Sequence, residues 1–288
     1  MTYLWSMVYS ASLKHRSALL AAFTCIALLW SAAAQAADRG RLEAFLEVTG
    51  FDVALESIKL SASSAPQMIG MDPNAFGADW TRVTQDVFDV EVMHDLALDI
   101  LEKTLSDPLL NHAAAFYASD LGQRLVVAEN ASHLKEDDED KQEEGAQIVA
   151  DLVQTGAARL QILQRMNRAV DVAGASVRAL QEIQMRFLLA ASAAGVIDLR
   201  MDAEDLRAVL SEREGALRRA IQQSSLAGAA YTYEPFSDAD LEAYAEALEH
   251  PDMQEVYVLM NAVQYEIMAN RFEVLARRMA DLHPGQDI

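Results

Sequence analysis

The strongest constraint on the fold is a stripe of apolar side chains that runs through the C-terminal segment without interruption. The stripe repeats at helical spacing, with Pro251 at its start and Pro284 beyond its end, and prolines at these places are typical of helix boundaries. The pattern predicts one helix of about 30 residues, roughly 45 Å long. An apolar face of this width must be covered by other helices. The stripe consists of Met253, Val256, Tyr257, Met260, Val263, Ile267, Met268, Phe272, Leu275, Met279 and Leu282.

The same periodicity covers most of the remaining chain, so we predict an all-α protein, a helical bundle. The six prolines all fall where a helix is expected to begin or end. Ser237 ahead of Asp240 is typical of a helix N-cap. Segment 187–197 is nearly all apolar but too short to cross a bilayer, so we expect a fully buried helix that ends near Gly195. The other predicted helices are 39–48, 52–62, 74–103, 107–118, 120–133, about 142–170, 176–194, 203–227 and 237–249.

Residues 1–36 have the three parts of a secretory signal. A basic start without acidic residues precedes the apolar stretch 18–30, and the following small residues include Ala34 and Ala36, which suit a signal peptidase. We therefore expect cleavage after Ala36 and a periplasmic location. The alternative is a retained N-terminal membrane anchor. The apolar core is shorter than the ~20 residues that span a bilayer, which favours cleavage.

Removal of this signal leaves 252 residues without a cysteine, because Cys25 is the only one in the chain. The mature chain then has no disulfide, no thiolate nucleophile and no cysteine-ligated zinc. We do not expect a lipoprotein anchor, since Cys25 lies in the middle of the apolar core. The formal charge is −21 for the whole chain and −23 without Lys14 and Arg16. Such a charge repels phosphate backbones and anionic lipid, so we predict no nucleic-acid partner and no transmembrane span in the mature chain.

The acidic run KEDDEDKQEEG at residues 135–145 is the main break in composition. It lacks the ligand spacing and central glycine of a calcium-binding loop. We therefore interpret it as an acidic hinge or a helix start. It separates a first helical unit at 37–134 from a second unit at 146–288, and the sequence leaves open whether the two share one core.

The two units look like diverged copies of one helical unit. The segment LSDPLL from Leu105 aligns with FSDADL from Phe236 at an offset of 131 residues. Both segments place a serine ahead of an amphipathic helix, which is followed by a break and a second amphipathic helix. A repeated order of elements is the signature of an internal duplication. The same offset brings Gln123 onto Gln254 and Asn130 onto Asn261.

Within the first unit stands the motif FYASDLGQ, from Phe116 to Gln123, preceded by Ser106. It resembles the signature of an exported bacterial family known as domain of unknown function 2059, whose motif is roughly Phe-Tyr-x-Ser-x-x-Gly-Gln. The resemblance covers about residues 105–124 and implies an all-helical exported protein, with no activity attached. In the second unit only the glutamine of the motif is retained, as Gln254.

Helix chemistry gives this motif a structural role. Ser106 is placed to begin one helix, with Phe116 on its buried side. Ser119 is placed to cap the next helix, with Asp120 in the first turn at the positive end of the helix dipole. In the second unit Pro251 stands where Asp120 would be, a first-turn position that proline favours. Both units therefore break and restart a helix at the same place.

Gly122 adds to this interpretation, because a residue without a side chain allows a neighbouring helix to approach closely. The motif is then a helix–corner–helix device. The alternative is that Tyr117, Ser119 and Gln123 are polar groups that line a ligand pocket.

The sequence contains no pattern typical of a catalytic or metal-binding site, and we expect no metal, no cofactor and no catalytic residue. The histidines are dispersed, without an H-E-x-x-H pair, and there is no G-x-S-x-G elbow or glycine-rich phosphate loop. His94 lies on an apolar helical face, which is typical of a hydrogen-bonded core histidine.

The sequence therefore favours a non-catalytic, envelope-associated binding or accessory protein, with an envelope protein as its partner. The first alternative is a carrier or chaperone-like binder, which would hold a small apolar ligand or a peptide between the two units with the methionines of the C-terminal helix. Core filling is the competing use of those methionines. The second alternative is a hydrolase whose active site is assembled from residues far apart in the sequence.

Overall fold

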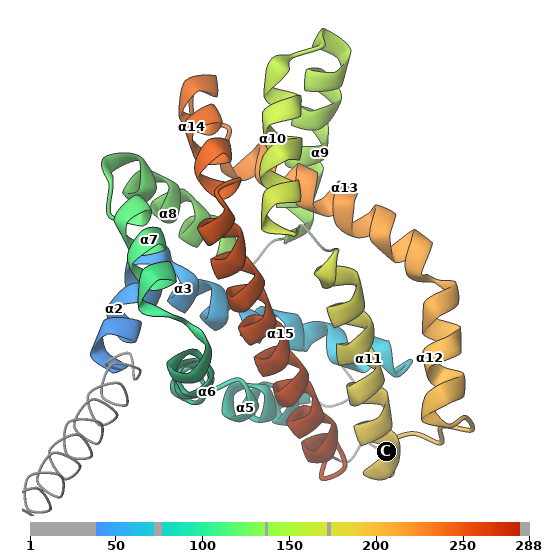
Figure 1. Cartoon of the computed structure of the whole chain (residues 1–288). Coiled ribbons are helices and arrows are strands. Elements are labelled where there is room, and N and C mark those ends of the chain that lie inside the picture. Colours follow the sequence, from blue (N-terminus) through green and yellow to red (C-terminus); the bar gives the residue numbers. More distant parts are fainter. Residues whose placement is uncertain (1–38, 72–76, 136–137, 172–173, 283–288) are drawn as a thin grey trace, which may run out of the picture. The chain divides into compact units, whose positions relative to one another are not determined.

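The computed structural model describes residues 39–71, 77–135, 138–171 and 174–282, and these residues form helices and connecting turns without a strand (Figure 1). The all-α prediction is confirmed. The predicted signal peptide at 1–36 and its cleavage site lie outside the described residues. The chain from Arg39 onward forms one compact unit. No helix of the described part is long and apolar enough to cross a membrane.

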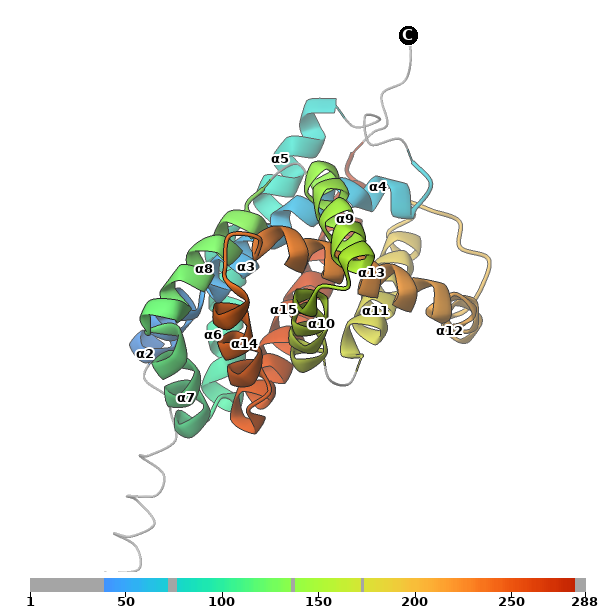
Figure 2. The same cartoon turned by 90° about the horizontal axis from the view of Figure 1, so that it is seen from above.

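Helix α15, Pro251–Met279, confirms the long C-terminal helix with 29 residues. It packs against α11, Ala175–Ala193, on one side and against α6, Val90–Thr104, and α7, Asp107–Tyr117, on the other, and Figures 1 and 2 both show it between them. Helix α15 therefore contacts helices of both predicted units. Three of its four methionines fill the core: Met253, Met260 and Met279 are each at most 2% exposed.

The remaining elements pack on these helices or on one another. In the N-terminal part they are α2 Arg39–Thr49, α3 Phe51–Glu56, the 3-10 helix η1 Ser57–Ser64, α4 Ala65–Met68, α5 Gly77–Val87 and α8 Asp120–His133. In the C-terminal part they are α9 Asp138–Thr155, α10 Ala158–Val170, α12 Ala203–Glu212, α13 Glu214–Thr232 and α14 Asp238–Leu248.

Three helices predicted as continuous are interrupted. The predicted helix 74–103 divides at Asp89, which caps α6 by accepting a hydrogen bond from the backbone N–H of Val92 at 3.0 Å. Helix 142–170 divides at Gly156, whose φ of 64° is left-handed, and helix 203–227 divides at Arg213. The apolar periodicity continues across each break, so the pattern alone could not reveal them. The predicted helix 52–62 likewise becomes α3 followed by η1.

The expectation of a fully buried helix over 187–197 is wrong. Helix α11 ends at Ala193, close to the predicted end, but only Phe187 and Ala191 of this segment are buried. The other side chains of the segment are half-buried or exposed. Much of the segment consists of alanine and glycine, which count as apolar in the sequence. Their small side chains nevertheless lie partly exposed at the end of α11.

From Asp138 onward, the acidic run belongs to α9. Its last residue, Gly145, lies inside the helix, where α13 crosses at close range. A Cβ atom at Gly145 would lie 2.1 Å from the carbonyl oxygen of Ala227. The glycine is therefore required by helix packing.

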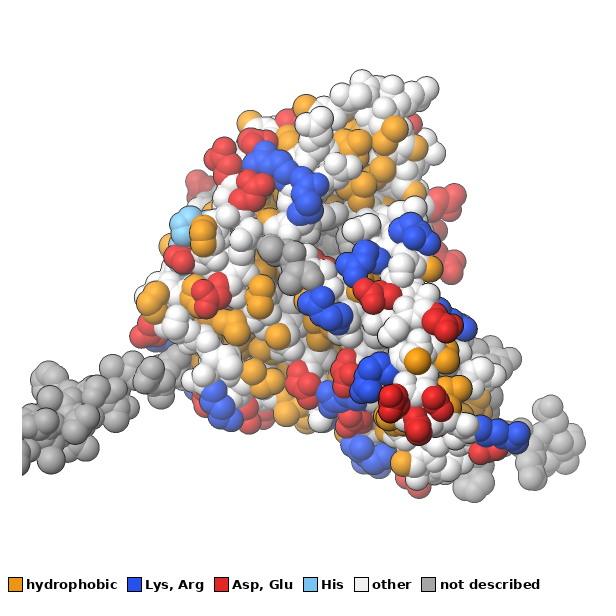
Figure 3. Space-filling view, turned by 45° about the vertical axis from the view of Figure 1, so that its right-hand side comes forward, with side chains coloured by type: hydrophobic (Ala, Val, Ile, Leu, Met, Phe, Trp, Pro, Cys, Tyr) orange, Lys and Arg blue, Asp and Glu red, His pale blue; other side chains and the backbone are white. Residues whose placement is uncertain are grey.

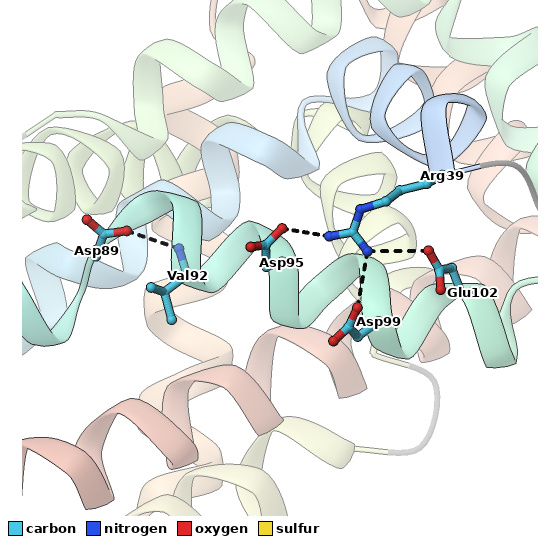
Figure 4. A network of polar contacts seen from close by, with 6 residues as sticks. All are labelled: Arg39, Asp89, Val92, Asp95, Asp99 and Glu102. Carbon is cyan, nitrogen blue, oxygen red and sulfur yellow. Dashed lines mark hydrogen bonds and ion pairs between the residues drawn. The ribbon is translucent and has the colours of Figure 1, made fainter.

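Helix α2 is fixed to α6 by Arg39, whose guanidinium pairs with three carboxylates of one α6 face (Figure 4). The distances are 2.6 Å to Asp95, 3.1 Å to Asp99 and 3.3 Å to Glu102. These pairs are largely exposed and add little stability individually. On the face drawn in Figure 3, basic side chains likewise lie among acidic ones.

Candidate functional site

The family-like motif forms the corner between α7 and α8. Ser119 is the N-cap of α8, and its hydroxyl accepts a hydrogen bond from the backbone N–H of Gly122 at 3.1 Å. Gln123 donates through its side-chain amide to the carbonyl oxygen of Tyr117 at 2.7 Å, which satisfies an acceptor at the end of α7. A Cβ atom at Gly122 would lie 2.4 Å from the carbonyl oxygen of Phe116. Gly122 thus permits the close approach of the two helices.

Two details of the corner differ from expectation. Ser106 stands at the N-cap of α7, but its side chain makes no capping hydrogen bond. Phe116 was expected on the buried side, yet it is only half-buried, and the neighbouring Tyr117 is 1% exposed. The end of α7 therefore turns Tyr117 into the core, and the two rings meet edge to face at 5.2 Å.

Replacement of Ser119 by alanine should lower the free energy of unfolding by about 1 kcal/mol, because the N–H of Gly122 loses its acceptor. Ser106→Ala is the matched control and should change it by less than about 0.5 kcal/mol, since Ser106 makes no such bond. Urea denaturation of both variants measures the difference. Equal effects would show that the hydroxyl of Ser119 does not act as a cap.

The buried hydroxyl of Tyr117 belongs to a cluster that we call the tyrosine–glutamate cluster: Tyr117, Tyr233, Tyr244, Tyr257 and Glu129. The hydroxyl of Tyr244 lies 3.1 Å from that of Tyr117 and 3.2 Å from that of Tyr257, and the hydroxyls of Tyr117 and Tyr257 also hydrogen-bond. Tyr244 and Tyr233 donate to Oε1 of Glu129 at 2.8 and 2.7 Å. Every hydroxyl proton therefore has an acceptor, and a chain of hydrogen bonds ends on the carboxylate.

Five different helices or helix ends supply this cluster. Tyr117 ends α7 and Glu129 lies in α8, whereas Tyr233 caps the end of α13 and Tyr244 and Tyr257 lie in α14 and α15. The cluster consequently joins the two predicted units. Shared networks of this kind fix one arrangement of a core, because an unpaired member would be costly.

Burial controls the protonation of the cluster. It raises the pKa values of Tyr117, Tyr233, Tyr244 and Tyr257 well above the usual value for tyrosine, so the hydroxyls stay neutral and act as donors. Burial also raises the pKa of the Glu129 carboxyl, against the opposing effect of the hydrogen bonds from Tyr233 and Tyr244. Among the described residues, no lysine or arginine forms an ion pair with Glu129.

A cavity of about 180 Å³ opens beside the cluster. The amide oxygen of Asn130, on the same helix as Glu129, is buried and has no hydrogen-bond partner in the described part of the chain. Of the residues predicted as pocket candidates, neither Ser119 nor Gln123 lines this cavity, and Tyr117 reaches it only through its hydroxyl partners. The lining residues are Thr49, Gly50, Phe51, Ala54, Glu129, Asn130, His133, Met166, Asn167, Val170, Tyr233, Tyr244, Leu248 and Tyr257.

The sequence did not single out Glu129, Tyr233 or Tyr244. Tyr257 belongs to the apolar stripe of the C-terminal helix. Its hydroxyl, the polar group in an otherwise apolar stripe, was the one sequence feature that could have pointed to a buried polar cluster. In the sequence, Glu129 does not differ from other acidic residues of an amphipathic helix. It becomes a buried hydrogen-bond acceptor only because α13 and α14 bring Tyr233 and Tyr244 to it.

The histidines are dispersed in the sequence, but the fold brings two of them into contact. His112 and His250 stack with ring centroids 4.3 Å apart, and with Asp252 they form a group that could hold a metal ion within the described residues. His94 is half-buried, with Nε2 3.3 Å from the carbonyl oxygen of Asp52, consistent with the expected hydrogen-bonded histidine.

Comparisons with known proteins found a match to one protein family. A search of the curated proteins and a search of the solved structures found no match to this chain. A family model does match, over a region that begins in α6, contains α7 and α8, and ends in α9. The resemblance predicted from the motif FYASDLGQ is therefore confirmed: residues 91–151 match the family described as uncharacterized protein conserved in bacteria (DUF2059).

Proposed function

We propose that the mature chain is an exported, non-catalytic binding protein of the bacterial envelope, and that it holds a small organic cation beside Glu129. The observation that carries the proposal is a carboxylate without a basic partner among the described residues, at a cavity walled by aromatic rings. The predicted signal peptide supplies the periplasmic location.

The chemistry of the cavity suits an ammonium group. Phe51 and Tyr257 meet edge to face at 5.8 Å on its wall, and aromatic faces attract cations most strongly where water is excluded. Glu129 offers the opposite charge, and both hydrogen bonds donated to it by the cluster go to its Oε1 atom. The strongly negative formal charge of the chain would raise the local concentration of a cationic ligand. An apolar or anionic ligand would leave the carboxylate uncompensated.

The same geometry favours binding over catalysis. Each tyrosine hydroxyl is neutral and already donates within the cluster, so none is free to act as an acid or a nucleophile. Glu129 accepts two of these donors at one oxygen, which holds the carboxylate in place.

The test is Glu129→Gln, which should abolish binding of small ammonium ions such as choline or putrescine in calorimetric titrations. Native mass spectrometry of protein isolated from the periplasm should show a retained cation in the wild type only. Glu246→Gln, at an exposed position of the adjacent α14, is the matched control and should bind normally. Wild-type protein that binds none of these ions, and is isolated bare, would contradict the proposal.

The affinity should also depend on pH. The pKa of Glu129 in the folded protein lies above the usual 4.5, so below it the carboxyl is protonated and binding is lost, and above it binding is retained. The sign for stability is the reverse: a charged, buried Glu129 opposes folding above pH 4.5. Without ligand, Glu129→Gln should therefore unfold at the same or a higher temperature than the wild type at pH 7.

The alternative, a carrier of an apolar ligand, has one supporting observation. A groove of about 400 Å³ lies along α11 and α15, with Ile183 and Ala262 in its lining and Val258, 55% exposed, beside them. It differs from the expected site, because both helices belong to the predicted second unit and no methionine lines it. A retained lipid in native mass spectrometry, unaffected by Glu129→Gln, would favour this alternative.

An envelope protein as partner is part of the same proposal. Crosslinking of the mature protein in intact cells would test it, and repeated capture of one defined protein is the expected result. A chain that crosslinks only to itself, or not at all, would leave small-ligand binding as its whole function.

We also propose that the chain arose by internal duplication. Helix α7 and helix α14 correspond residue by residue at the offset of 131, from Asp107 and Asp238 at their starts to Tyr117 and Leu248 at their ends. Helix α2 packs on α7 as α10 packs on α14.

The two asparagines that align at this offset occupy corresponding places. Asn261 donates to the carbonyl oxygen of Val170 at the end of α10 at 2.9 Å, and Asn130 lies against Gly50 at the end of α2. An experimental structure in which α2, α3, α7 and α8 fail to superpose on α10, α11, α14 and α15 would contradict the proposal.

A further inference from the structure

We infer that His112, His250 and Asp252 form a binding site for a divalent transition-metal ion. The two imidazole rings stack at 4.3 Å with an interplanar angle of 26°. One Oδ2 atom of Asp252 lies 4.0 Å from Nδ1 of His112 and 3.9 Å from Nδ1 of His250. A possible ligand atom of each residue lies within 4.8 Å of the others.

Local structure holds these three side chains in place. His250 is the N-cap of α15, where its backbone is extended and its Nδ1 accepts from the N–H of Asp252 at 3.2 Å. A metal ion bound through Nδ1 would replace this N–H as the partner of that nitrogen. Pro251 lies between them and fixes the first turn of the helix. His112 projects from α7, which packs against α15, and is half-buried. The site is therefore formed by two helices that meet only in the folded chain.

The geometry is close to that of a metal site. Bonds of 2.0–2.1 Å in a tetrahedral site place ligand atoms about 3.3 Å apart. The Asp252 oxygen would need to approach each nitrogen by about 0.6–0.7 Å, and the two histidine ligand atoms, within 4.8 Å of one another, by up to about 1.5 Å. Side-chain rotations that unstack the two rings would bring these atoms together. Three protein ligands leave the fourth position open to water or an exogenous ligand.

Ligand chemistry selects the metal. Two imidazoles with one carboxylate favour Zn²⁺, Ni²⁺ or Cu²⁺ over Mg²⁺ and Ca²⁺, which prefer oxygen ligands only. The strongly negative formal charge of the chain would also raise the local concentration of any divalent cation.

Metal binding should stabilise the fold, because it links α7 to α15. At a Zn²⁺ concentration 100 times Kd, the melting temperature of the mature chain should rise by about 5–10 °C. The protein must carry no polyhistidine tag and be stripped with EDTA first. Calorimetry should find one Zn²⁺ per chain, and Co²⁺ should give the visible absorption of a low-coordination site.

Two variants remove the imidazole ligands and leave the local structure intact. His250→Asn retains an N-cap acceptor, and His112→Asn replaces a half-buried ring with a smaller polar group. Each should lower the affinity for Zn²⁺ at least tenfold and abolish the Co²⁺ absorption. The matched control is His94→Asn, at a half-buried position outside both this group and the Glu129 cavity, and it should bind as the wild type does.

Melting temperatures in EDTA provide the second measurement. All three variants should then unfold within a few degrees of the wild type, so that a lost Zn²⁺ response reflects a lost ligand. Wild-type protein that binds no Zn²⁺, Ni²⁺ or Cu²⁺ at micromolar concentration would overturn the inference. Unchanged affinity in the double variant His112→Asn/His250→Asn would do the same. Both results are independent of ligand binding at Glu129.

Discussion

Replacement of Tyr117 by alanine is expected to reduce the free energy of unfolding by about 3–5 kcal/mol. The side chain is 1% exposed, so its removal leaves a cavity beneath the α7–α8 corner. It also deprives the hydroxyls of Tyr244 and Tyr257 of a partner. Urea denaturation followed by circular dichroism measures the loss.

Tyr117→Phe separates the two contributions, because it keeps the ring and removes only the hydroxyl. We expect a smaller loss of about 1–2 kcal/mol. Phe116→Ala is the matched control within the same motif, and it should cost less than Tyr117→Ala since Phe116 is half-buried. A larger loss for Phe116→Ala would mean that the motif buries the other aromatic ring.

Gly145→Ala is expected to lower the free energy of unfolding by about 2–3 kcal/mol, although alanine normally favours a helix. The added Cβ would lie 2.1 Å from the oxygen and 2.6 Å from the carbonyl carbon of Ala227. Backbone atoms cannot rotate away as a side chain would, so α9 and α13 must separate. Thermal unfolding and denaturant midpoints both report the change.

Gly215→Ala is the matched control, since Gly215 also lies in a helix, α13, but has open space around it. The nearest atom to its added Cβ would be the flexible guanidinium of Arg219, at 3.8 Å. This variant should raise the free energy of unfolding by about 0.5–1 kcal/mol. A stabilising effect at both positions would show that α9 and α13 do not approach as closely as described.

Helix ends with a chemical marker could be predicted from the sequence. Ser119 and Ser237 are N-caps and Pro251 is the first helical residue, as predicted, because capping and proline chemistry act within a few residues. The breaks at Asp89 and Arg213 escaped prediction. The apolar stripe continues through them, and the turns depend on which neighbouring helix each half must cover.

Of the residues in the tyrosine–glutamate cluster, only Tyr117 was predicted from the sequence as a candidate site residue. Tyr117 belonged to the motif, whereas Glu129, Tyr233 and Tyr244 had no local pattern to distinguish them from ordinary helical residues. Their roles depend on distances between helices far apart in the chain. The stacking of His112 on His250 likewise depends on the packing of two helices that are far apart in the chain, so the sequence could not predict it.

The sequence by itself determined that this chain is helical, where most helices start, and that α15 must be covered on a wide apolar face. These properties follow from periodicity and capping, which are local. Only the tertiary structure decided that one unit forms from Arg39 onward, that Gly145 is a crossing point, and that four tyrosines converge on Glu129. Those outcomes depend on contacts between helices that are far apart in the chain. The free energy of such contacts depends on both partners, so it cannot be inferred from the sequence of one segment.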